Sequence, residues 1–332
     1  RPPSRVRTLW LLAAIPVMAI AAACSVRFGS RSVSWSEVWS ALGGSDATIG
    51  EAAVTKRIPR TVLALTVGAA LGVSGAVMQG VTRNPLADPG VLGVNMGASL
   101  AVVVGIAYFD LVDPTDYIWA AIAGAAVTAV FVYAVGSLGR GGPTPLKLAL
   151  AGAATSAAFT SFVTAIVLPR NNISDTVQSW QIGGVGGATW DKLSLIGPFL
   201  LVGLLVCVGS ARGLNSLALG DELAAGLGEN VALTRALASI GAVVLCGAAT
   251  AVCGPIGFVG LVVPHACRLL SGPDYRWVIP LSAVTGASLL MISDTVGRVV
   301  ARPGEIDVGI ITAFIGAPAF ILIVRRHRVR EL

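Results

Sequence analysis

Long apolar runs separated by short polar stretches dominate this chain of 332 residues. The long runs reach the length of about 20 residues that an α-helix needs to cross the hydrocarbon core of a bilayer. Only 12% of the residues are charged, against roughly 25% in soluble domains. Aromatic residues make up 6% of the chain and no ten-residue segments alternate in polarity, which argues against a β-barrel. The sequence therefore predicts an all-α integral membrane protein.

Hydropathy predicts about ten transmembrane helices in one domain that covers residues 1–332. The eighth helix is expected to be short and to contain Pro264. Two polar segments, at about 27–56 and 169–192, are expected as loops on the outer side, the first with a short helix at 35–42. The expected spans cover residues 9–26, 61–80, 91–109, 117–138, 148–168, 193–211, 236–253, 256–270, 277–292 and 308–324.

The basic residues are distributed unevenly over this predicted topology. More than half of the 23 lysines and arginines fall on the side of the N-terminus when that end is placed inside. Cytoplasmic loops of membrane proteins carry an excess of lysine and arginine, so we expect both termini in the cytoplasm. The same asymmetry explains the formal charge of +6 without nucleic acid as a partner.

The sequence lacks the residues that ion-coupled transport, ATP binding and metal binding require. No charged residue lies in the interior of a predicted span, whereas ion-coupled carriers usually need such groups. None of the lysines follows a glycine, so the Gly-Lys of a P-loop is missing and any ATP must bind to another chain. His265, His327 and the five scattered cysteines form no ligand cluster. We therefore expect no cofactor or metal in this chain, and any metal cargo must arrive as a chelate.

One enzyme motif has two interpretations. Ser74 lies in the second span and His265 in the eighth, and such a pair on two helices could form an intramembrane protease dyad. Alternatively, Ser74 bonds to a backbone carbonyl within a face of small residues that includes Gly68 and Gly72. We favour the second interpretation.

A polar segment, Arg212–Arg235, separates the sixth and seventh spans. Within it, Asp221 can cap a short helix, Glu222 lies in the first turn and Gly228 can end the helix. So short a helix is not stable alone, so we expect it to dock onto another protein, with an ordinary connecting loop as the alternative. The apolar side of this helix would consist of Leu223, Ala224 and Leu227.

Five stretches of the chain resemble one family, in order along the sequence. They read RIPRTVLALTVGAALGVSGAVMQGVTRNPLADPGVLGVNMGA (57–98), LALAGAA (148–154), LNSLALGDELAAGLG (214–228), GPIGFVGLVVPHACRLLSGPDYR (254–276) and IGAPAFIL (315–322). The chain resembles the FecCD or BtuC-like permeases, which are subunits of ATP-binding-cassette (ABC) importers for ferric siderophores, haem and cobalamin. The resemblance implies a BtuC-like type II ABC importer permease fold in the inner membrane of a bacterium. It also implies a second permease, two cytoplasmic ATPases that bind ATP and Mg²⁺, and an external substrate-binding protein.

The resemblance also implies roles for three groups of residues. The segment at about 213–230 becomes the coupling element for the ATPase, through Leu219, Asp221, Glu222, Ala225, Leu227, Gly228 and Glu229. Docking of the substrate-binding protein is assigned to Arg57, Arg60 and Arg298, with lipid-headgroup contact as the alternative. A cytoplasmic gate is assigned to Asn84, Leu86, Thr144, Pro145 and Leu146, for which a plain turn is the alternative. The chain departs from the family at Asp307, where proline is common, and this puts the local outer geometry in question.

The resemblance favours a ferric siderophore as the cargo, with cobalamin or haem as the alternative. The stretch NPLADPGVLGVNMGA is most similar to the first member of paired siderophore permeases, which favours a heterodimer over a homodimer. A passive channel is the alternative from another class, and it would need no ATPase.

Overall fold

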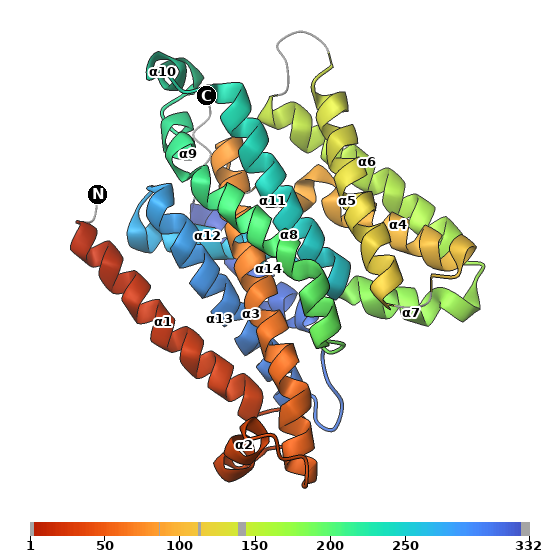
Figure 1. The fold of residues 1–332 in the computed structure, drawn as a ribbon. Helices are drawn as coiled ribbons and strands as arrows, with labels where there is room; N and C mark the ends of the chain where they lie inside the picture. The colour runs from red at the N-terminus through yellow and green to blue at the C-terminus, as the bar shows by residue number, and fades with distance from the viewer. Residues whose placement is uncertain (1–2, 86, 112–113, 139–143, 327–332) are drawn as a thin grey trace.

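Every regular element that the structure assigns is a helix. The computed structural model describes residues 3–85, 87–111, 114–138 and 144–326 (Figure 1). The first half contains α1 (Ser4–Arg27), α2 (Trp35–Leu42), α3 (Ile49–Thr82), the 3-10 helix η1 (Pro89–Leu92), α4 (Val94–Phe109), α5 (Pro114–Gly136) and α6 (Pro145–Val167). The second half contains α7 (Asn171–Ile182), α8 (Trp190–Gly209), α9 (Ala211–Leu217), α10 (Asp221–Gly226), α11 (Val231–Cys253), α12 (Val259–Ser271), α13 (Tyr275–Val300) and α14 (Val308–Arg326).

The prediction of an all-α membrane protein is confirmed. Within the described ranges, seven helices are long and apolar enough to cross a membrane, namely α1, α3, α5, α6, α8, α11 and α13. Three shorter apolar helices, α4, α12 and α14, complete the set of about ten that hydropathy predicted. The short α2 lies where the sequence placed it.

Helix α3 lies at the centre of the bundle and α1 at its edge. In the most apolar window of α3, 78% of the residues are buried, against 11% in α1. Figure 1 shows α3 running through the middle of the molecule, with α1 packed along one side. The two helices therefore differ in their surroundings, since α3 packs against other helices whereas α1 leaves most of its apolar surface exposed.

The central packing depends on glycines in α3. A side chain on Gly68 would meet the carbonyl oxygen of Gly286 in α13 at 2.4 Å, and one on Gly72 would meet that of Ser282 at 2.3 Å. Glycine at these positions lets the two backbones touch, as is common where membrane helices pack. The predicted packing face at Gly68 and Gly72 is confirmed.

Two helices extend beyond their predicted ends. Helix α3 begins at Ile49, because Thr48 and Glu51 form a capping box at its start. Helix α13 continues to Val300. Hydropathy ends a span at the first charged residues, but the backbone continues as a helix where those charges find partners in the protein. The predicted spans 61–80 and 277–292 contain no charged residue, whereas the helices α3 and α13 that extend them carry charges at one end. Much of the polar segment 27–56 is helical.

Candidate functional site

The polar segment between α8 and α11 folds as two short helices, α9 and α10. Gly220 joins them with φ of +109°, and Gly228 follows α10 with φ of +85°, both in the region that favours glycine. The predicted stop at Gly228 is confirmed. The cap differs, because Gly220 occupies the N-cap position and Asp221 is the first helical residue. The Asp221 carboxylate binds two arginine side chains instead of capping the helix.

Asp221 connects α10 to two distant parts of the chain. Its Oδ1 accepts a hydrogen bond from Nη2 of Arg83 at 2.8 Å, and both carboxylate oxygens accept from Nη2 of Arg235 at 3.1 and 3.2 Å. Arg83 ends α3 and Arg235 lies in the first turns of α11. The side chains of Asp221 and Arg83 are 44% and 40% exposed, so this pair adds at most about 1 kcal/mol to stability. The two pairs fix the position of α10 relative to α3 and α11.

Helix α9 is fixed to the start of α13. Leu214 and Leu217 are fully buried. The Asn215 side chain donates to Oδ1 of Asp274 at 2.7 Å and accepts from the backbone N–H of Tyr275 at 2.9 Å. A movement of α9 would therefore displace the first turn of α13.

The α10 region presents apolar side chains to its surroundings. Ala224 is fully buried, whereas Leu219, Leu223 and Leu227 are 52%, 63% and 68% exposed. The predicted apolar side is thus divided, since Ala224 faces the protein and the leucines face outward. We call Leu219, Leu223 and Leu227 the leucine patch. Glu222 and Ala225 are exposed beside it, and Glu229 accepts a hydrogen bond from the Thr234 hydroxyl.

The residues predicted as a gate lie in two separate connections. Asn84 is exposed in the turn after α3, and Leu86 lies outside the described residues. Thr144 caps α6 by accepting the backbone N–H of Lys147 at 3.3 Å, and Pro145 is the first residue of that helix. Leu146 is 69% exposed. These positions are consistent with stiff helix starts, and a gating role stays a prediction.

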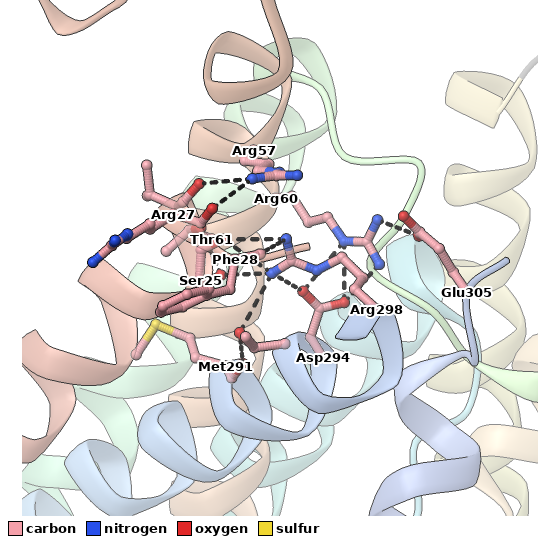
Figure 2. Close-up of polar contacts among 12 residues, drawn as sticks. Ser25, Arg27, Phe28, Arg57, Arg60, Thr61, Met291, Asp294, Arg298 and Glu305 are labelled. Atoms are coloured by element: carbon pink, nitrogen blue, oxygen red, sulfur yellow. Dashed lines mark hydrogen bonds and ion pairs between the residues drawn. The ribbon is translucent and has the colours of Figure 1, made fainter. Parts of the chain in front are cut away.

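At the opposite end of the bundle, two arginines cap the C-terminal end of α1 (Figure 2). Arg57 donates to the carbonyl oxygens of Arg27 at 2.9 Å and Arg31 at 2.6 Å. Arg298 donates to those of Ser25 at 3.1 Å and Phe28 at 2.9 Å. The last carbonyls of a helix have no partner inside it, and cations are favourable at that end. The two side chains therefore hold α1 against α3 and α13.

A chain of ion pairs extends from this cap toward the surface (Figure 2). Asp294 pairs with Arg298 at 2.8 Å and with Arg60 at 2.7 Å, and Arg60 pairs in turn with Glu305 at 2.7 Å. Arg57 and Arg298 are only 7% and 1% exposed, while the Glu305 side chain is 40% exposed. All three arginines assigned to docking thus bind partners within the chain, and their docking role stays a prediction.

Asp307, the departure from the family pattern, lies beside this cluster and is half-buried. Burial raises the pKa of its carboxyl group, and the nearby Arg60 guanidinium acts in the opposite direction. The substitution therefore adds a carboxyl group next to the Arg60–Glu305 pair.

The sequence did not identify the internal partners of these residues. Arg298 follows Asp294 by one helical turn, which is a detectable signal, but Asp294 was placed beyond the end of its span. The pair of Arg83 with Asp221 joins residues 138 positions apart, and no local pattern predicts it.

Ser74 has the environment of a packing residue. It is fully buried, and its hydroxyl donates to the carbonyl oxygen of Leu71 at 3.0 Å within the same helix. The alternative in which Ser74 bonds to a backbone carbonyl is therefore confirmed. Among the described residues, no group of three or more His, Cys, Asp or Glu side chains could hold a metal ion.

We expect Ser74→Ala to leave the protein folded and working. The change removes one local hydrogen bond and replaces serine by the better helix former, so the two effects partly cancel within about 1 kcal/mol. Thermal unfolding in detergent and labelling with a serine-directed fluorophosphonate check this. Labelling of the wild-type chain that Ser74→Ala abolishes would contradict it.

Comparison with known proteins shows one family and several permeases that are similar to this chain. Residues 17–326 match the FecCD transport family. The chain is 40% identical to the probable siderophore transport system permease protein YfiZ of Bacillus subtilis, over 95% of each chain. It is 41% identical to the ferric enterobactin transport system permease protein FepD of Escherichia coli, over 93% of each chain. A solved structure, an inward-facing conformation of a putative metal-chelate type ABC transporter, superposes with a TM-score of 0.84 at 27% identity, over 96% of this chain and 99% of that one.

Proposed function

The chain belongs to the FecCD transport family, and from this premise we propose that it carries ferric siderophores across the inner membrane of a bacterium. It is a membrane-spanning permease subunit of an ABC importer. In the proposed assembly it shares the pathway with a second permease, two cytoplasmic ATPases bind ATP and Mg²⁺, and an external protein delivers the cargo. Both termini then lie in the cytoplasm, as the distribution of basic residues favours.

One observation carries the proposed energy coupling. The leucine patch is exposed on α10 and on the residues that flank it, while Asp221 and Asn215 tie the same two short helices to α11, to the end of α3 and to α13. Exposed apolar surface of this kind marks a protein contact. A push on the patch would therefore reach three long helices at once. This supports α9 and α10 as the coupling element, with Glu222, Ala225, Gly228 and Glu229 beside the contact.

The end of the bundle that carries α2 and the arginine cluster is the proposed docking side for the substrate-binding protein. Of the three predicted docking arginines, Arg60 is the one that pairs with an exposed carboxylate, Glu305, so a partner carboxylate would compete with Glu305 for Arg60. Arg57 and Arg298 act as positioning residues, because their guanidinium groups hold the end of α1.

The cargo proposal is supported by the names of the relatives, which include siderophore and ferric enterobactin permeases. Cobalamin or haem is the second candidate, since permeases named for cobalamin and hemin also match the chain. The second permease is proposed to be a different chain, on the resemblance of NPLADPGVLGVNMGA to the first member of paired permeases.

Reconstituted uptake tests this function. We expect liposomes that contain the complete assembly to accumulate a ferric siderophore only with ATP inside and the loaded binding protein outside. Ferric hydroxamate, ferric catecholate, haem and cobalamin are compared at equal concentration. Liposomes with this permease but no ATPase are the control. Uptake in that control would identify a passive channel, and uptake of cobalamin or haem alone would replace the proposed cargo.

A further inference from the structure

Two adjoining cavities lie where α1, α9 and α13 begin and α8 ends. The first, which we call the polar pocket, has a volume of about 540 Å³ and is lined by Arg7, Arg212, Arg276, Asp274 and Asn215, among others. The second, which we call the apolar groove, has a volume of about 430 Å³ and is lined by Val208, Gly209, Ile279 and Pro280. Arg212 and Arg276 line both cavities. A charged compartment and an apolar one thus meet at two guanidinium groups.

The polar pocket has more positive charge than its own residues neutralise. Its carboxylate, Asp274, accepts from Nη1 of Arg7 at 3.3 Å, from the Asn215 side chain at 2.7 Å and from the backbone N–H of Arg276 at 3.1 Å. The exposed side chains of Arg212 and Arg276 have no ion pair among the described residues. Nε of Arg7 is buried without a hydrogen-bond partner in the same part of the structure. The pocket therefore has unused donors for an anion.

The apolar groove adjoins an exposed apolar face of α8. Leu201, Leu205 and Val208 form a stripe along α8 and are 59%, 62% and 51% exposed. Spacing of four and three residues places them on one face of the helix. This face leads along α8 to Gly209, where an added side chain would meet nothing within 4 Å. An apolar chain in the bilayer can therefore reach the groove without crossing polar surface.

From this arrangement we propose that the two cavities form one binding site for an anionic phospholipid. An acyl chain occupies the apolar groove between α8 and α13, and the phosphodiester lies between Arg212 and Arg276. A phosphodiester bears one negative charge and accepts hydrogen bonds from guanidinium groups, which matches the unused donors. Basic clusters at the membrane boundary commonly bind such headgroups. An acidic side chain of a partner protein would fill the polar pocket but leave the groove empty.

A lipid in this site would join α9 to α13 beside Asn215. The polar pocket also reaches Leu219, the first residue of the leucine patch. The bound lipid would therefore stiffen the contact through which α9 displaces α13.

Native mass spectrometry of the purified, delipidated full chain in detergent tests the proposal. Phosphatidylglycerol and phosphatidylcholine with the same acyl chains are titrated separately, and inorganic phosphate is added as a competitor. We expect phosphatidylglycerol to bind at least about tenfold more tightly than phosphatidylcholine, because phosphatidylcholine carries the same phosphodiester together with a trimethylammonium cation. Arg212 and Arg276 repel that cation, at about fivefold for each guanidinium group. Millimolar inorganic phosphate should leave the lipid bound, since it lacks the acyl chain.

Three variants separate the two halves of the site. Arg212→Gln and Arg276→Gln should each weaken phosphatidylglycerol binding about fivefold. Gly209→Phe should weaken it by filling the groove while it keeps every charge. Arg5→Gln is the matched control, because Arg5 is an exposed arginine on α1 that does not line the pocket, and it should bind as the wild type does.

Four results would overturn the proposal. They are equal binding of the two lipids, equal effects of Arg5→Gln and the two pocket variants, loss of the lipid to inorganic phosphate alone, and release of the lipid when the partner ATPase binds. The third result would indicate a site for a free anion, and the fourth would assign the pocket to the ATPase interface.

Discussion

Replacement of Arg298 by methionine is expected to destabilise the protein by about 3 to 5 kcal/mol, the range found when one partner of a buried ionic network is removed. Arg298 is 1% exposed. Its guanidinium group donates to the carbonyl oxygens of Ser25 and Phe28 and pairs with Asp294. Methionine fills a similar volume but leaves those carbonyls without a donor. We expect a lower thermal midpoint in detergent and increased protease cleavage between α1 and α2.

Arg31→Met is the matched control for this change. The Arg31 side chain is exposed, and only its backbone carbonyl contacts the cluster, by accepting from Arg57. The control should unfold at the wild-type temperature. An Arg298→Met variant that is equally stable would mean that Arg57 alone secures the end of α1. A loss of binding-protein affinity without a loss of stability would restore Arg298 as a docking residue.

The apolar helices were predictable because a single constraint decides them. A chain segment in lipid must satisfy its backbone groups internally, so a long apolar run can only be a helix. Hydropathy did not predict α7 as a helix, because its twelve residues are polar and too few to span a bilayer. It also shortened α13, because Asp294 and Arg298 read as the start of a loop when their partners are unknown. Hydropathy detects contact with lipid, and these segments contact protein or lie outside the membrane.

The candidate site was predictable in position but not in its contacts. The polar segment with Asp221 and Gly228 stands out between two apolar spans, and a short helix with a glycine stop was a local inference. The partners Arg83 and Arg235 were not, because they depend on how α3 and α11 pack against each other. The outward orientation of Leu223 and Leu227 was undecided for the same reason. Local sequence specifies an element, whereas its charged partners come from tertiary packing.

Introduction of charge into the leucine patch is expected to separate the permease from the ATPase that we propose as its partner. In the double variant Leu223→Asp with Leu227→Asp, both changed side chains are more than 60% exposed, so the chain should still fold and insert. Burial of one leucine contributes about 1.5 to 3 kcal/mol. Loss of two should therefore weaken ATPase binding by roughly a hundredfold or more. Co-purification of the ATPase and ATP-driven uptake measure the effect.

Leu42→Asp is the control, because Leu42 is 56% exposed on α2 at the opposite end of the bundle and should not affect ATPase retention. Retention of the ATPase by the double variant would remove the leucine patch from the interface.

Asp221→Ala should act differently, because Asp221 contacts its own chain and not the proposed partner surface. It breaks the pairs with Arg83 and Arg235 and leaves the leucine patch in place. We expect the ATPase to co-purify at the wild-type level and to hydrolyse ATP, while uptake per ATP falls about tenfold or more because α10 no longer moves α3 and α11 with it. Asp191→Ala, which removes an exposed carboxylate at the far end of α8, should keep the wild-type ratio. If Asp221→Ala lost the ATPase as the leucine variant does, Asp221 would be needed for ATPase binding itself. The proposed division, in which the leucine patch binds the ATPase and Asp221 links α10 to α3 and α11, would then be wrong.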